Sequence, residues 1–149
     1  MNFKDKEIAK NNFEYFVEYI LYLNFNDNFQ YYYNNISSDR IQTITKQISR
    51  QSCLTTFISA YGHFLSLNYK SVIIFSKYNK ELWYNRNIAR DFYKSTGLNL
   101  TRNISFHNIG NFDFVLRGRT NCTVLFDECE TDNILKCSLY HLEKAIFFS

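Results

Sequence analysis

A chain of 149 residues, 46% hydrophobic and 19% aromatic, is long enough to bury a core, which excludes an intrinsically disordered protein. Its formal net charge of +3 permits contact with nucleic acid without requiring it. No apolar run is long enough to span a membrane and no signal peptide is evident, so we expect one folded domain without a membrane partner.

The cysteines and histidines give no sign of a metal site. The cysteines include no Cys-x-x-Cys pair, and the histidines lie far apart without metal-ligand spacing. These residues are Cys53, Cys122, Cys129 and Cys137, and His63, His107 and His141. We predict reduced, structural cysteines, as in a cytosolic protein, and histidines without a ligand role.

The first 36 residues are predicted to form a helical segment in front of an α/β core of residues 37–149. Within residues 3–23, Phe13, Phe16, Val17 and Ile20 recur at helical spacing on a single face, which favours one core-packing helix. The pair Phe29-Gln30 follows, immediately before three consecutive tyrosines.

A strand, a helix and a second strand are expected next, which is a βαβ unit. Residues 41–48 alternate between apolar and polar, which predicts a strand, and residues 57–67 have a helical period opened by Thr55 or Thr56. Residues 71–76 are continuously apolar, which is typical of a strand buried on both faces of a parallel sheet. A long helix is predicted over 79–96, ended by Gly97.

The predicted helix 79–96 carries a stripe of cations. Arg86, Arg90 and Lys94 recur every four residues and therefore share one face. Together with Arg117 and Arg119 they are candidates to bind DNA phosphates or an acidic partner, and a solvated helix face explains them equally well. We expect the only tryptophan, Trp83, to be packed in the core.

The last third of the chain is predicted to be mostly strands. Residues 103–106 and 112–116 are expected to pair as a hairpin across a turn. Residues 122–126 form an apolar strand that ends in Asp127 and Glu128. An amphipathic helix over 133–144 and a final strand over 145–149 complete the chain.

Residues 48–57, between the first strand and the next helix, resemble the ATP-binding loop of the large terminase subunit, the DNA-packaging motor of tailed phages. That family carries Ser-Arg-Gln-x-Gly-Lys-Thr-Thr, and this chain keeps Ser49, Arg50, Gln51, Thr55 and Thr56. The Phe-Gln pair upstream, the Arg-Gly pair at 117–118 and the acidic strand end at 127–128 resemble terminase features in order and spacing.

Two residues depart from the family pattern at the centre of the loop. Cys53 occupies the place of a glycine, and a positive φ there would cost a residue with a side chain roughly 1–2 kcal/mol. Leu54 occupies the place of the phosphate-binding lysine, which removes a charge-assisted contact worth roughly 1.5–3 kcal/mol. We therefore expect no useful ATP hydrolysis.

The resemblance implies ATP contacts for Gln30, Arg50, Gln51, Thr55 and Thr56. Gln30 would read the adenine edge, because its amide both donates and accepts hydrogen bonds. Arg50 would touch the phosphates and partly replace the missing lysine. Without that lysine, the alternative role of the two threonines is to cap the helix.

The acidic strand end completes the implied site. Asp127, together with Thr55, would hold Mg²⁺, and Glu128 would orient the attacking water. Asp127, Glu128 and a vestigial Arg50 are therefore the catalytic candidates. Without a metal-phosphate partner, the two carboxylates become an acidic spot at a sheet edge.

We expect a three-layer α/β sandwich with a mainly parallel central sheet, whose strands lie near 41–48, 72–76, 124–126 and 145–148. The resemblance implies a terminase-like pseudo-ATPase of phage origin that lacks the nuclease domain and acts as a binding, regulatory or structural protein. Its partner would be the phage motor, the portal or another copy of itself, with DNA possible. It would reside in the bacterial host cytoplasm or in the virion. No cofactor is expected, and Mg-ATP only if the site still works.

Two other functions stay open. The first is a divergent or split DNA-packaging ATPase subunit that needs a partner chain for turnover. The second is a nucleic-acid-binding module that uses the five cations at positions 86, 90, 94, 117 and 119.

Overall fold

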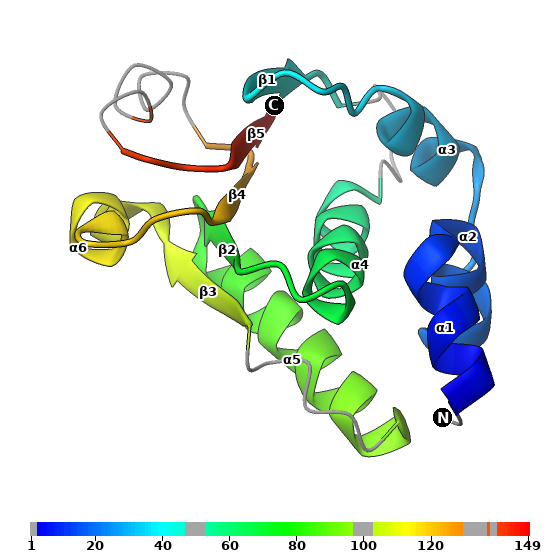
Figure 1. Cartoon of the computed structure of the whole chain (residues 1–149). Coiled ribbons are helices and arrows are strands. Elements are labelled where there is room, and N and C mark those ends of the chain that lie inside the picture. Colours follow the sequence, from blue (N-terminus) through cyan, green and yellow to red (C-terminus); the bar gives the residue numbers. More distant parts are fainter. Residues whose placement is uncertain (1–2, 47–52, 97–102, 130–136, 138–139) are drawn as a thin grey trace.

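The computed structural model describes residues 3–46, 53–96, 103–129, 137 and 140–149. Within these residues, five strands form one sheet in the order β1-β5-β4-β2-β3, and all neighbouring strands are parallel (Figure 1). The strands are β1 (Ile41–Ile44), β2 (Val72–Ser76), β3 (Ile104–Asn108), β4 (Thr123–Asp127) and β5 (Lys144–Phe148). The sequence-based prediction of an α/β protein with a parallel sheet is confirmed.

The strand predicted at 72–76 coincides with β2. The strands predicted at 124–126 and 145–148 lie inside β4 and β5. Their residues are buried almost throughout, because crossover helices cover both faces of a parallel sheet. The first strand is shorter than the predicted range 41–48. It ends at Ile44, Thr45 and Lys46 lie outside it, and residues 47 and 48 lie outside the described part of the chain.

Helices cover both faces of the sheet, which gives three layers (Figure 1). The connections β1-α4-β2 and β2-α5-β3 run in the same direction along the sheet, so right-handed crossovers place α4 (Leu54–Leu67) and α5 (Asn79–Thr96) on one face. The connection β3-α6-β4 runs back, so α6 (Phe112–Leu116) covers the other face. The bounds of α5 are those predicted from the sequence.

The sheet separates two hydrophobic cores, because successive side chains of a strand point to opposite faces. Val72 and Ile74 of β2 belong to the core under α4 and α5, and Ile73 and Phe75 belong to the core under α6. α4 approaches the sheet closely at Gly62, where a Cβ atom would lie 3.0 Å from Cδ1 of Ile74.

The N-terminal segment packs outside α4 as four short helices (Figure 1). They are α1 (Phe3–Asn11), α2 (Phe13–Tyr15), the π-helix η1 (Phe16–Ile20) and α3 (Asp27–Asn34). The prediction of one helix over 3–23 is wrong, because Asn12 leaves helical geometry and its side chain accepts a hydrogen bond from the Tyr15 N–H at 2.9 Å. The expected apolar face is nevertheless buried.

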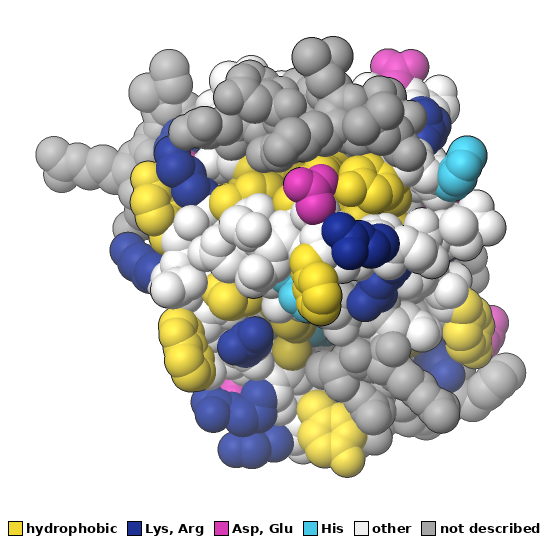
Figure 2. Space-filling model, turned by 90° about the vertical axis from the view of Figure 1, so that its left-hand side faces the viewer, with side chains coloured by type: hydrophobic (Ala, Val, Ile, Leu, Met, Phe, Trp, Pro, Cys, Tyr) yellow, Lys and Arg dark blue, Asp and Glu magenta, His cyan; other side chains and the backbone are white. Residues whose placement is uncertain are grey.

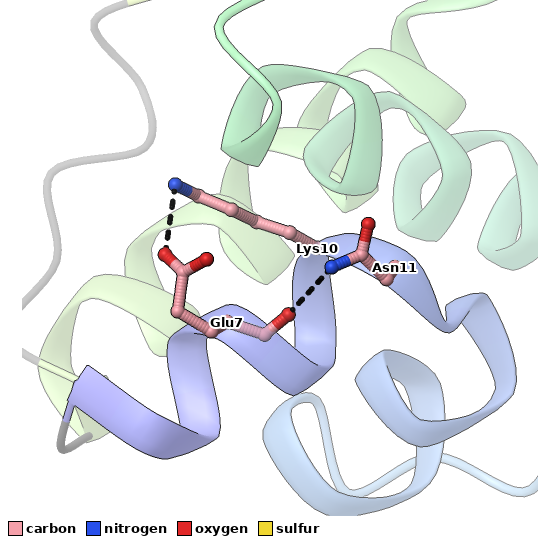
Figure 3. A network of polar contacts seen from close by, with 3 residues as sticks. All are labelled: Glu7, Lys10 and Asn11. Atoms are coloured by element: carbon pink, nitrogen blue, oxygen red, sulfur yellow. Dashed lines mark hydrogen bonds and ion pairs between the residues drawn. The ribbon is translucent and has the colours of Figure 1, made fainter.

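Polar contacts join Glu7, Lys10 and Asn11 of α1 to one another (Figure 3). Lys10 Nζ lies 3.3 Å from Glu7 Oε1, and the Asn11 side-chain amide donates to the Glu7 carbonyl at 3.1 Å. Lys10 also lies over the Tyr69 ring, with its Nζ 4.8 Å from the ring centroid, which ties α1 to the end of α4.

The hairpin expected over 103–116 is wrong. β3 is a parallel edge strand beside β2, and it is followed by the 3₁₀ helix η3 (Ile109–Asn111) and by α6. Phe112, Val115 and Leu116 are spaced for a helix, and burying these three side chains against the sheet selects the helical conformation.

The helix predicted over 133–144 is wrong at its C-terminal end. Residues 140–143 are not helical, and Lys144 already belongs to β5. Pairing of Lys144 with Thr123 of β4 extends the sheet in place of the helix. Residues 133–136, 138 and 139 lie outside the described residues.

Candidate functional site

The first turn of α4 lies at the carboxyl-terminal edge of the sheet. The N-cap position belongs to Cys53, so the prediction that Thr55 or Thr56 caps the helix is wrong. Cys53 has a φ of 53°, in the left-handed region that a glycine adopts without strain. Leu54, the first residue of the helix, is only 3% exposed and belongs to the core under α4.

Thr55 and Asp127 form the polar centre of this edge. The Thr55 hydroxyl, on α4, donates a hydrogen bond of 2.7 Å to Asp127 Oδ2, at the end of β4. Asp127 is 1% exposed, and its Oδ1 has no hydrogen-bond partner among the described residues. Burial raises the pKa of Asp127 to about 6, the hydrogen bond from Thr55 opposes this shift, and the nearby carboxylates of Glu128 and Glu81 add to it.

Glu128 is paired with a lysine that lies two residues beyond the end of β1. Its carboxylate lies 2.6 Å from Lys46 Nζ, and this hydrogen bond and the negative charge raise the pKa of the lysine. The Glu128 N–H donates to the Phe148 carbonyl at 2.8 Å, and its φ of 54° is left-handed. The sequence reasoning did not identify Lys46 as a site residue.

A pocket of about 520 Å³ opens between the start of α4 and the first half of α5. Its described lining comprises Cys53, Leu54, Thr55, Thr56, Lys80, Glu81, Trp83, Tyr84, Asn87 and Glu128. The volume lies within the range of small-ligand sites in proteins. Glu81 Oε2 is a second buried carboxylate oxygen without a partner among the described residues.

Aromatic side chains of α5 form the outer wall of this pocket. Tyr84 is fixed by a hydrogen bond of 2.8 Å between its hydroxyl and that of Thr56. Trp83 is 63% exposed, so the prediction of a core tryptophan is wrong. It faces outward because Leu82, Asn85 and Ala89 occupy the buried side of α5.

The other predicted ATP contacts are not brought to the described lining. Gln30 is exposed on α3 and its side-chain amide donates to Asn34 Oδ1 at 2.7 Å. The neighbouring Phe29 is buried in the core. Arg50 and Gln51 lie outside the described residues, so the predictions for them stay predictions.

The five predicted partner-binding cations are exposed: Arg86, Arg90, Lys94, Arg117 and Arg119. Arg119 and Arg86 both lower the pKa of His107 on β3, in addition to the larger effect of burial. Arg86, on α5, and Arg119, after α6, therefore lie around the same sheet edge. Figure 2 views the side that carries α6, where Lys and Arg side chains lie between hydrophobic ones and acidic side chains are isolated.

The site residues on α5 were not predicted from the sequence, although the order of the strands in the sheet indicates where they lie. In the parallel pairing of β2 with β4, Ser76 lies opposite Asp127, so both strands end at the same edge. The helix that follows β2 must therefore start beside Asp127. This rule points to Glu81 and Tyr84 once the strand order is known.

The four cysteines form no disulfide among themselves. Within the described part of the chain, no three His, Cys, Asp or Glu side chains are grouped so as to hold a metal ion. No described helix is both long and apolar enough to cross a membrane.

Comparisons with protein-family models, with curated protein sequences and with solved structures found no match to this chain. The functional interpretation therefore rests on the residues and their geometry.

Proposed function

We propose that the chain is a terminase-like pseudo-ATPase domain that acts by binding a partner and not by hydrolysing ATP. The observation that carries the proposal is the start of α4, where a phosphate loop needs a glycine followed by a lysine. The glycine position holds Cys53 in a left-handed conformation, and the lysine position holds Leu54 with its side chain in the core. A glycine would adopt the left-handed conformation without strain, and a lysine would supply the positive charge that contacts the phosphates.

Mg-ATP fits this site only in part. The Thr55 hydroxyl and Oδ1 of Asp127, which has no partner within the described part of the chain, are oxygen donors of the kind that Mg²⁺ takes. The triphosphate charge has few counterparts, because Leu54 is apolar and Lys46 is paired with Glu128, which leaves Lys80 as the cation of the described pocket lining. The described residues therefore do not fit a triphosphate, and we assign no catalytic step to them.

A domain of this kind would act through its surface. The proposed partners are the phage motor, the portal or a second copy of the chain, in the cytoplasm of a bacterial host or in the virion. The net charge of +3 and the exposed arginines favour an acidic partner surface.

Titration calorimetry with Mg-ATP tests the proposal. We expect no binding by the wild-type protein and a gain of binding by the double variant Cys53→Gly/Leu54→Lys, which restores the loop pattern of the family. Micromolar binding by the wild-type protein that is lost in Asp127→Ala would overturn the pseudo-ATPase interpretation. A folded double variant that still binds no nucleotide would overturn the terminase-like interpretation of the loop.

Among the described residues Oδ1 of Asp127 has no hydrogen-bond partner, which favours a second function, a divergent or split packaging ATPase. Arg50 would then replace the lysine, and another chain would complete the motor. This function predicts ATP turnover only after a protein that supplies the missing domain is added. Turnover should disappear in Asp127→Asn, which preserves the shape of the side chain.

The exposed arginines at the β3 edge favour a third function, a nucleic-acid-binding module. Arg86, on α5, and Arg119, after α6, are both exposed and both near His107 of β3. Binding through phosphate contacts predicts an affinity for DNA that falls steeply as salt rises. Weak, salt-insensitive binding would contradict it.

A further inference from the structure

The outward face of α5 combines aromatic rings with cations. Trp83 is 63% exposed, and Arg86, Arg90 and Lys94 are exposed at three, seven and eleven positions further along the helix. With 3.6 residues per turn, Trp83, Arg90 and Lys94 lie along one line of the helix, with Arg86 beside it. The cation stripe predicted from the sequence therefore contains a tryptophan that is not used in the core.

The charge of this face favours a polyanion. On α5 up to Lys94, the cations are Lys80 and the three members of the stripe, and the acids are Glu81 and Asp91. Glu81 directs a buried carboxylate oxygen inward, away from the exposed face, and Asp91 lies 3.7 Å from the Arg90 guanidinium. A ligand that approaches α5 from solvent therefore meets mainly positive charge.

The exposed ring of Trp83 favours single-stranded over duplex nucleic acid, a distinction that the positive charge of α5 does not make. Bases in a duplex stack on one another, whereas the bases of a single strand are free to stack on an aromatic side chain. Trp83 offers such a ring within one turn of Arg86, and Tyr84 lies beside it on the pocket wall. The arrangement suits alternating bases and phosphates.

We propose that α5 is a binding site for single-stranded nucleic acid, in which a base stacks on Trp83 and phosphates contact Arg86, Arg90 and Lys94. The inference deepens the third function by naming the form of nucleic acid. It does not depend on the state of the ATP site. A protein partner with an acidic surface is the competing occupant, and the experiment separates the two.

Tryptophan fluorescence gives a direct test, because Trp83 is the only tryptophan in the chain. The wild-type protein would be titrated with a short oligothymidylate, an oligouridylate, a duplex of the same length, and heparin. We expect the single strands to quench the fluorescence and to bind at least about tenfold more tightly than the duplex, the effect of about one stacked base. Heparin should bind without comparable quenching.

Variants measured by anisotropy of a labelled oligothymidylate locate the site. Trp83→Ala should weaken binding about 5- to 150-fold, and Trp83→Phe should recover part of the loss. Arg90→Ala and Lys94→Ala should each lower the salt slope by about one unit. Tyr19→Ala, an exposed aromatic of η1, and Lys4→Ala, an exposed cation of α1, are matched controls that should bind as wild type.

The outcomes separate the inference from the functions on which it builds. Equal affinity for duplex and single strand, or an unaffected Trp83→Ala, would overturn the single-strand site and leave a duplex-binding module standing. Absence of any nucleic-acid binding would overturn both. Binding of a polyglutamate peptide through the same residues, without oligonucleotide binding, would likewise overturn the inference and assign the face to an acidic protein partner.

Discussion

Replacing Asp127 by asparagine tests the electrostatics of the candidate site. The ordinary pKa of the carboxyl is 3.8, and burial raises it to about 6 in the folded chain. Between these two values the native state binds more protons than the unfolded state, so the free energy of unfolding must fall as pH rises through this window. A shift of this size corresponds to about 3 kcal/mol in all, of which about 2.4 kcal/mol falls between pH 4 and pH 7.

The variant Asp127→Asn would keep the shape of the side chain and could still accept the hydrogen bond from the Thr55 hydroxyl, but it carries no charge at this position. Urea unfolding followed by circular dichroism, at several values between pH 4 and pH 7, gives the free energy of unfolding of both proteins. The difference, wild type minus Asp127→Asn, should fall by about 2.4 kcal/mol across this range. The buried neutral His63 contributes to both proteins alike and cancels in the difference.

The slope of this free-energy difference against pH decides whether the pKa of Asp127 is raised in the folded chain. Parallel stability curves for wild type and Asp127→Asn would refute the reasoning, because they would mean that the carboxyl titrates alike in the folded and unfolded chains. Asp91→Asn is the matched control, since it makes the same chemical change at an exposed position of α5. Thr55→Val should enlarge the effect, because it removes the hydrogen bond that opposes the pKa shift.

Three further changes have defined outcomes. Cys53→Gly should raise the free energy of unfolding by about 0.5–1 kcal/mol, because the relief of a left-handed backbone exceeds the extra freedom of glycine in the unfolded chain. Phe147→Ala should lower it by about 3–5 kcal/mol, because Phe147 is fully buried and stacks on Phe126 with ring centroids 4.0 Å apart. Lys46→Ala should change it by less than about 1 kcal/mol, since its ion pair is exposed to solvent, and salt should abolish the difference. Chemical denaturation at neutral pH measures all three.

Each of these changes has a control or a contradicting result. Cys53→Ala keeps the left-handed strain and should not be stabilising, so equal gains from alanine and glycine would point to the thiol instead of the backbone. Phe114→Ala removes the same ring from a position that is 80% exposed and should have an effect within about 0.5 kcal/mol. A large, salt-resistant loss in Lys46→Ala would show that the ion pair with Glu128 is worth more than its exposure implies.

The local sequence pattern was sufficient to predict a helix or strand where its apolar residues fit only one kind of element well. The apolar run of β2 is typical of a strand covered on both faces, and the helical pattern of α5 is followed by Gly97, so α5 was predicted with its bounds and β2 to within one residue. Residues 112–116 carry four apolar side chains in five positions, which satisfies a strand as well as a helix. Their assignment depended on the direction of the connection back across the sheet, which local sequence does not contain.

The α/β class, the parallel sheet and the lack of a glycine and a lysine at the start of α4 could be predicted from the residues alone, because hydrophobic pattern and side-chain chemistry are local properties. The hydrogen bond of Thr55 to Asp127, the ion pair of Lys46 with Glu128 and the exposure of Trp83 beside the pocket became known only from the folded chain. These contacts join residues up to 82 positions apart. They follow from strand order and crossover handedness, which bring distant segments to one edge of the sheet.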